Sequence, residues 1–152
     1  MMRPRKPTLC LLFILLSLIS IAQTNSTKDK QRLQQTVSDF FDALSARDSN
    51  RLKSYAAPDI LLFENGAVWN LDSLLLKAIR LNTDPSFKRS NSFSFLSTTI
   101  RKTTGWVSYK LVSEFYSNNK QRTAHWMETV IAIKEKGKWK IKVLHSTLIK
   151  RT

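Results

Sequence analysis

The sequence contains few of the residues on which several common architectures depend. One cysteine among 152 residues excludes an intrachain disulfide and a cysteine-based zinc site. Three glycines and four prolines exclude a collagen-like or Gly/Pro-rich low-complexity chain. Acidic residues are also scarce, because 11 Asp and Glu stand against 25 Lys and Arg, a formal charge of +14. The rest is 42% hydrophobic, with eight Phe and four Trp, which is typical of one globular domain.

Residues 1–22 are predicted to form a secretory signal peptide. Residues 3–7 are cationic, residues 8–22 carry no charge, and Ser20 and Ala22 place small residues at −3 and −1 of a cleavage site before Gln23. The alternative is a membrane anchor, but the apolar run of about 14 residues is shorter than the roughly 20 that a spanning helix needs. Cleavage would leave a thiol-free chain of 130 residues with charge +11. We expect a secreted or periplasmic protein with no membrane span in its mature form.

Three helices are expected after a polar leader at residues 23–29, within a domain at residues 30–150. The first covers residues 30–47, where apolar residues recur at the i, i+3, i+4 spacing of an amphipathic helix: Leu33, Val37, Phe40, Phe41 and Leu44. A second runs to Tyr55 and is capped by Ser49 or Asn50. A third ends near residue 81 and is capped by Asn70 or Asp72.

Six strands are expected in the same domain. Residues 60–69 form a small hairpin, because Asn65-Gly66 tolerates the positive φ angles of a tight turn. From Phe87 the apolar period changes to two, and short turns separate four long strands that end near Ile149. Helices that are segregated from an antiparallel meander define an α+β fold. Three helices across the concave side of a twisted sheet would leave a cone whose open end is a pocket.

Several local phrases, in this order, carry a family resemblance over residues 30–149. They are Phe40-Phe41-Asp42-Ala43-Leu44, then Asp48, Tyr55-Ala56-Ala57-Pro58-Asp59, Glu64-Asn65-Gly66, Glu128-Thr129, Gly137-Lys138-Trp139 and His145-Ser146-Thr147. With the element order, they resemble the SnoaL-like branch of the nuclear transport factor 2-like superfamily. The closing hairpin also looks like the association domain of calmodulin-dependent kinases. The resemblance implies a cone-shaped domain with an apolar cavity, often dimeric through the outer sheet face.

Three titratable residues are candidates for catalysis. His145 ionises near neutral pH and shares strand parity with Trp139 and Ile141, so it could act as a base or a ligand donor at the pocket, or as a hydrogen-bonded structural residue. Glu114 and Glu128 lie on strands where a carboxylate could face the cavity and gain a raised pKa, although salt bridges to lysines are the favoured alternative. Glu64 is interpreted as part of a turn. His125 and Glu128 differ in parity and cannot form a local pair.

The remaining pocket candidates are aromatic. Trp69, Tyr109, Trp126 and His145 are expected to line a ligand pocket, with core packing as the alternative for the two tryptophans. In relatives of the ketosteroid isomerase type an aspartate abstracts the proton, yet this chain has no Asp after Asp84. We therefore expect binding of a small hydrophobic or amphipathic molecule without catalysis. An isomerase, dehydratase or cyclase that uses a pocket carboxylate and His145 remains the alternative.

Other partners follow from charge and from ligand spacing. No metal and no cofactor are expected, because the two histidines have no nearby carboxylate at ligand spacing. Lysines alternate through the last hairpin at positions 134, 136, 138, 140 and 142. A second alternative function is therefore a basic interaction module that makes weak contact with an anionic envelope surface, and no nucleic-acid binding is expected. Both faces of the last strands carry apolar residues, which predicts a homodimer.

Overall fold

The computed structural model describes the backbone of residues 8–152 and the side chains of residues 26–152. The predicted signal peptide, residues 1–22, lies outside the described residues: residues 1–7 entirely, and the others in all their side chains. Within the part of the chain that is described, no helix is both long enough and apolar enough to cross a membrane.

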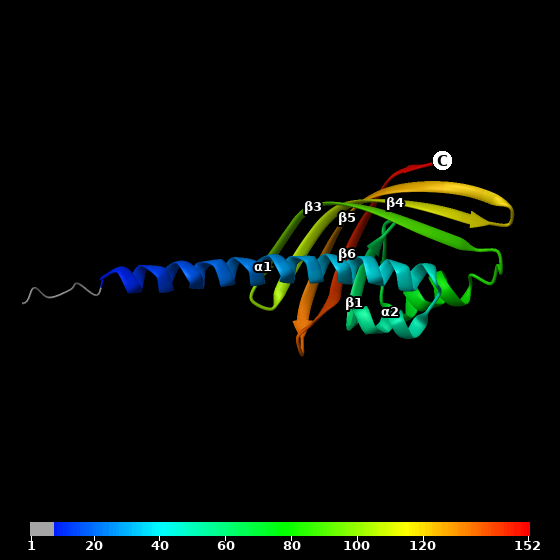
Figure 1. The fold of residues 1–152 in the computed structure, drawn as a ribbon. Helices are drawn as coiled ribbons and strands as arrows, with labels where there is room; N and C mark the ends of the chain where they lie inside the picture. The colour runs from blue at the N-terminus through cyan, green and yellow to red at the C-terminus, as the bar shows by residue number, and fades with distance from the viewer. Residues whose placement is uncertain (1–7) are drawn as a thin grey trace, which may run out of the picture.

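Three α-helices lie against one sheet, as Figure 1 shows. The helix predicted at residues 30–47 is the later part of a longer helix, α1 (Thr8–Ser45), which also includes the leader predicted at residues 23–29. This later part crosses the sheet and buries the predicted stripe, including Leu33 and Phe40. Helix α2 (Ser49–Tyr55) is capped by Asp48, one residue before the predicted Ser49 or Asn50, because the Asp48 carboxylate accepts the backbone N–H groups of Asn50 and Arg51. Helix α3 (Leu71–Leu75) is capped by Asn70 as predicted and continues as a π-helical turn, η1 (Leu76–Arg80).

The strands form one six-stranded sheet in the order β2-β1-β6-β5-β4-β3. Their bounds are β1 (Ala56–Glu64), β2 (Ala67–Trp69), β3 (Lys88–Arg101), β4 (Thr104–Ser117), β5 (Lys120–Glu135) and β6 (Lys138–Arg151). The predicted meander of four long antiparallel strands is confirmed, and the fold is mixed α+β. The expected antiparallel sheet needs one correction, because β1 pairs in parallel with β6. This pairing joins residues about eighty positions apart, which local periodicity cannot indicate.

Helix α1 approaches β4 closely at Gly105. An added Cβ there would lie 2.5 Å from Leu33 Cδ2 and 3.3 Å from the Thr99 carbonyl oxygen. Leu33 is fully buried and has little freedom to move away. Gly105 therefore lets the helix rest directly on the strand.

Strand β6 contains a β-bulge that reverses the alternation of its side chains. Ala132 pairs with Ile141, but the preceding Ile131 pairs with Val143, so Lys142 is the extra residue. Trp139 and Ile141 point inward before the bulge, and Leu144 and Ser146 do so after it. His145 consequently points outward, the opposite of the predicted parity.

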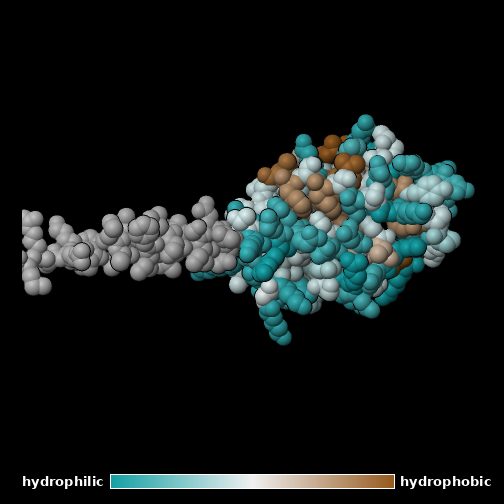
Figure 2. All heavy atoms as spheres, in the orientation of Figure 1, coloured by the Kyte–Doolittle hydropathy of each residue, from teal (hydrophilic) through white to brown (hydrophobic). Residues whose placement is uncertain are grey.

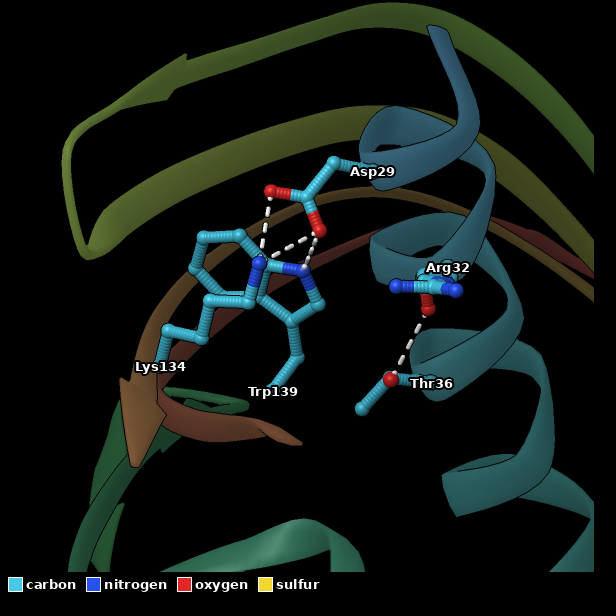
Figure 3. A network of polar contacts seen from close by, with 5 residues as sticks. All are labelled: Asp29, Arg32, Thr36, Lys134 and Trp139. Carbon is cyan, nitrogen blue, oxygen red and sulfur yellow. Dashed lines mark hydrogen bonds and ion pairs between the residues drawn. The ribbon is translucent and has the colours of Figure 1, made fainter. Parts of the chain in front are cut away.

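A polar network fastens α1 to the last hairpin (Figure 3). Asp29 on α1 accepts hydrogen bonds from Lys134 Nζ at 2.7 and 2.8 Å and from Trp139 Nε1 at 3.2 Å. Two other lysines of the predicted stripe are also engaged, because Lys142 pairs with Asp59 and Lys140 donates to the Ser54 carbonyl oxygen. The predicted row of free lysines is therefore reduced to Lys136 and Lys138.

Candidate functional site

An inner cavity of about 150 Å³ lies between α1, the α3–η1 segment and the sheet. Three of the residues that line it are charged: Glu64, Arg89 and Glu128. The other ten are apolar: Phe40, Phe41, Leu44, Leu62, Trp69, Leu74, Ala78, Phe115, Trp126 and Leu144. A hollow with an apolar wall and a few polar groups is the usual form of a small-molecule site.

Four polar residues form a continuous row across the inner face of the sheet. Tyr109 on β4 is the cross-strand partner of Glu128 on β5, and Glu128 is the partner of Ser146 on β6. Ser146 is in turn the partner of Glu64 on β1, through the parallel pairing. The sheet register therefore brings two carboxylates, a phenol and a hydroxyl side by side.

Glu128 is the most deeply buried carboxylate of the described residues, at 4% exposure. Ser146 Oγ donates a hydrogen bond of 2.7 Å to its Oε1, whereas its Oε2 has no partner among the described residues. Burial raises the pKa of Glu128, and the Ser146 and Tyr109 hydroxyls oppose that rise. Glu128 therefore keeps a free oxygen and an enhanced affinity for a proton.

Tyr109 stands beside Glu128 and is fully buried. Burial and the Glu128 carboxylate raise the pKa of Tyr109 well above its ordinary value, so the phenol keeps its proton at neutral pH. Its hydroxyl interacts electrostatically with Glu128, but no hydrogen bond of good geometry joins the two groups. Tyr109 does not line the cavity, so it acts on the carboxylate rather than on a bound molecule.

Glu64 supplies the second carboxylate at the end of β1. Asn65 Nδ2 donates a hydrogen bond of 3.0 Å to its Oε1. Burial raises the pKa of Glu64, while the Ser146 hydroxyl and the Arg89 charge lower it. The inner cavity thus holds two carboxylates with raised proton affinity, a condition that recurs at sites of acid–base chemistry.

Arg89 on β3 is the cation of the inner cavity. Its Nε donates to Asn91 Oδ1 at 2.9 Å and its Nη2 to Ser113 Oγ at 3.1 Å. The guanidinium also lies over the rings of Phe115, Phe41 and Trp126, at 5.0, 5.3 and 5.9 Å from their centroids. Burial lowers its pKa to about 10, opposed by Glu128 and Glu64, so it stays charged at neutral pH.

Trp69 contributes an unused donor to the same cavity. Its indole Nε1 is buried and has no hydrogen-bond partner among the described residues. The Lys77 ammonium lies 4.5 Å from the centroid of its ring. A buried N–H without a partner costs free energy, which a bound acceptor would recover.

The structure separates the predicted site residues into two groups. Trp69, Trp126 and Glu128 line the inner cavity, and Tyr109 lies directly beside Glu128. His145 and Glu114 are exposed on the outer side of the sheet. His145 stacks edge-on with Phe63 at 6.1 Å, and Glu114 accepts a hydrogen bond of 3.4 Å from Ser90 Oγ. The prediction that His145 lies at the pocket is wrong because the β6 bulge was not foreseen.

Sequence reasoning missed two residues of the cavity. Glu64 was interpreted as a turn residue, and its role depends on the parallel pairing of β1 with β6. Arg89 was not singled out among 25 basic residues. Its alternation with Asn91 and Phe93 on β3 was the one available signal for an inward position.

An outer basin of about 400 Å³ adjoins the inner cavity and shares Leu44, Ala78, Arg89 and Phe115 with it. Its remaining lining residues are Lys77, Leu81, Asn82, Phe87, Ser117 and Arg122. No group of three His, Cys, Asp or Glu side chains that could hold a metal ion occurs among the described residues. The four shared residues make the inner cavity and the outer basin direct neighbours.

Solved structures with the same fold come from functionally diverse proteins. A ketosteroid isomerase-like protein from Erwinia carotovora matches with a TM-score of 0.66 at 12% identity, over 80% of this chain and 97% of that one. A hexachlorocyclohexane dehydrochlorinase matches with a TM-score of 0.69 at 14% identity, over 86% and 91% of the two chains. A calmodulin-dependent kinase hub from S. rosetta matches with a TM-score of 0.64 at 18% identity, over 79% and 96%. Identities this low establish similarity of fold alone.

Family membership follows from the sequence itself. No curated protein matches the chain significantly. The family model of the SnoaL-like domain, however, matches residues 33–149, from Leu33 of α1 to near the end of β6. The chain therefore belongs to the SnoaL-like family, in the nuclear transport factor 2-like superfamily.

Proposed function

We propose that this domain binds a small molecule in the inner cavity and transfers a proton to or from it through Glu128. The observation that carries the proposal is the free Glu128 Oε2 in a mostly apolar cavity, on a carboxylate whose pKa is raised by burial. A base whose pKa approaches the working pH is the most effective in general acid–base catalysis. We therefore prefer the alternative of an enzyme with a pocket carboxylate to passive binding. His145 has no part in this proposal.

Four groups in and beside the cavity have distinct roles in this proposal. Glu128 Oε2 accepts a proton from an acidic C–H bond, and the electron pair of that bond moves into an adjacent carbonyl. Trp69 Nε1–H offers a hydrogen bond to the developing oxyanion. Return of the proton to another carbon completes an isomerisation, whereas loss of a leaving group completes an elimination. Tyr109 and Ser146 are positioning residues that hold and tune the carboxylate.

The size of the cavity limits the substrate. A cavity of about 150 Å³ is comparable to an engineered protein cavity that accommodates benzene. The described geometry therefore suits a body of one six-membered ring rather than a steroid. The names of the isomerase-like and dehydrochlorinase neighbours support reactions of this class and do not identify the substrate.

The test uses cyclohex-3-enone, a one-ring ketone whose conversion to the conjugated isomer is followed by ultraviolet absorbance. We expect the full chain to accelerate the conversion, and Glu128→Gln to lower kcat by about 10²- to 10⁴-fold. Glu114→Gln is the matched control, because Glu114 is an exposed carboxylate on the outer side of the sheet. Equal rates for wild type and Glu128→Gln, together with equal rates of α-hydrogen exchange in D₂O, would contradict the proposal and leave passive binding.

Two further proposals concern the whole chain. We propose that it is exported after cleavage between Ala22 and Gln23, for which the cationic and apolar N-terminal segments are the support. Mass spectrometry of the protein from a secreting host should find Gln23 as the first residue. We also propose a homodimer through the outer side of the sheet, and its test is argued in the Discussion.

A further inference from the structure

We infer that the outer basin binds an oxyanion, so that the ligand is a small amphipathic anion: a one-ring apolar body in the inner cavity and a negatively charged head in the basin. This inference rests on the proposed function for the place of the apolar body and adds the chemical class of the ligand. The basin's lining includes three cations, Lys77, Arg89 and Arg122, and no carboxylate.

The three cations come from three separate elements. Arg89 lies at the start of β3, Arg122 near the start of β5, and Lys77 on η1. The π-helical turn of η1 is a local departure from α-helical geometry, and such turns are frequent at functional sites. That turn carries both Lys77 and Ala78 to the boundary between the two hollows.

Among the described residues, none of these three cations forms an ion pair with a carboxylate. Arg122 has no hydrogen bond or ion pair there, and Lys77 only lies over the Trp69 ring. Arg89 uses Nε and Nη2 for neutral partners, which leaves Nη1 for a ligand. Guanidinium groups with free N–H donors are suited to binding carboxylate and phosphate oxygens.

The nearest carboxylates do not neutralise the basin. Asp84 is bonded to Ser117 of the basin's lining, and the Ser117 and Ser86 hydroxyls lower its pKa, so it keeps its charge. This is one negative charge against the three cations of the lining. Glu64 and Glu128 line the inner cavity and not the basin, and of the three cations it is Arg89 on which their charges act. An anionic head would therefore enter a region of net positive charge directly beside an apolar hollow.

The experiment is isothermal titration calorimetry of the full chain with phenylacetate and its uncharged analogue phenylacetamide. At low salt we expect phenylacetate to bind at least about tenfold more tightly than the amide, and this preference should shrink at high salt because exposed charges are screened. Lys77→Gln and Arg122→Gln should each weaken phenylacetate binding by about three- to fivefold and amide binding by less than twofold. Lys138→Gln is the matched control, because Lys138 begins β6 and lies outside the basin's lining. It should change the affinity for neither phenylacetate nor the amide.

Phenyl phosphate distinguishes the two kinds of head group. Tighter binding than phenylacetate would assign a phosphate head and weaker binding a carboxylate head, and both results support the oxyanion site. Equal affinity for acid and amide, a Lys138→Gln effect as large as that of Arg122→Gln, or no binding of either probe would overturn it.

The two proposals fail separately. Cyclohexenone carries no charge, so turnover without anion preference refutes the oxyanion site alone. Anion-selective binding by a protein that shows no Glu128-dependent turnover refutes proton transfer alone.

Discussion

Ionisation of the buried Glu128 carboxyl destabilises the folded state, and replacement by the neutral glutamine should show this. Burial raises the pKa of this carboxyl, so the folded state holds the proton more tightly than the unfolded chain does. The contribution of Glu128 to the free energy of unfolding is therefore greatest below the ordinary carboxyl pKa of about 4.3. It falls as the pH rises from there through the raised pKa of the folded state.

Glu128→Gln should consequently unfold at a higher temperature than wild type at pH 8, and the difference should disappear below about pH 4. The amide oxygen can still accept the Ser146 hydrogen bond. Thermal unfolding across this pH range is the measurement, with the exposed Glu114→Gln as control. A Glu128→Gln variant that is less stable than wild type at pH 8 would mean that the carboxylate is stabilised in the fold.

The effect of Tyr109 on the pKa of Glu128 can be tested without changing a residue that lines the cavity. Its hydroxyl has no completed hydrogen bond and favours the ionised form of Glu128. Tyr109→Phe should therefore change stability by less than about 1 kcal/mol. It should also raise the pKa of Glu128, moving the acidic limb of kcat/KM to higher pH. Tyr116→Phe, which alters an exposed tyrosine bonded to Asn119, should leave the limb in place.

At the scale of elements, the Asp29 network determines how firmly α1 is held. Asp29 joins the helix to Lys134 and Trp139 in a partly exposed setting, with the Asp29 and Lys134 side chains 21% and 25% exposed. Asp29→Asn keeps an acceptor but loses the charge, and should lower the free energy of unfolding by about 1 kcal/mol.

Hydrogen exchange should show the loss concentrated in α1 and the β5–β6 turn. Asp42→Asn removes an exposed carboxylate from the same helix and provides the control. If both variants lose equal stability, the effect belongs to helix charge and not to the network.

The elements also show which parts of the site the sequence could predict. Apolar spacing predicted the part of α1 after residue 30, the α3–η1 segment and the four long strands, because each pattern is local. Strand parity placed His125 and Glu128 on opposite faces, and that relation holds because β5 pairs with β4 without a register shift. Parity failed for His145, where the extra residue Lys142 reverses it. Glu64 depended on a long-range parallel pairing that leaves no periodic signal.

At the scale of the whole molecule, the outer side of the sheet is unusually apolar for a free surface. The outer patch consists of five large side chains, each between 38% and 45% exposed: Leu61, Phe63, Trp106, Met127 and Ile131. Trp106 pairs with Ile131, Ile131 with Val143, and Val143 with Leu61, so the patch spans neighbouring strands without interruption. Figure 2 shows apolar atoms gathered along the edge of the molecule over the long strands.

A second copy of the same chain is the partner that we propose for the outer patch. A continuous apolar surface is costly to leave in water, and a two-fold axis would cover it with an identical surface. Basic residues outnumber acidic residues by 25 to 11, so an uncharged strip is where two such molecules would repel each other least. Sedimentation equilibrium at micromolar concentration should therefore give twice the 17.5 kDa of one chain.

Ile131→Glu should dissociate this dimer, because it places a charge at the centre of the patch on each copy. Leu76→Glu alters an apolar residue of η1 that is 43% exposed and does not belong to the sheet, and should leave the mass doubled. Circular dichroism checks that both variants are folded. Since the inner cavity lies on the opposite side of the sheet, a folded Ile131→Glu monomer should still bind phenylacetate; loss of binding with dissociation would mean that the partner copy shapes the cavity.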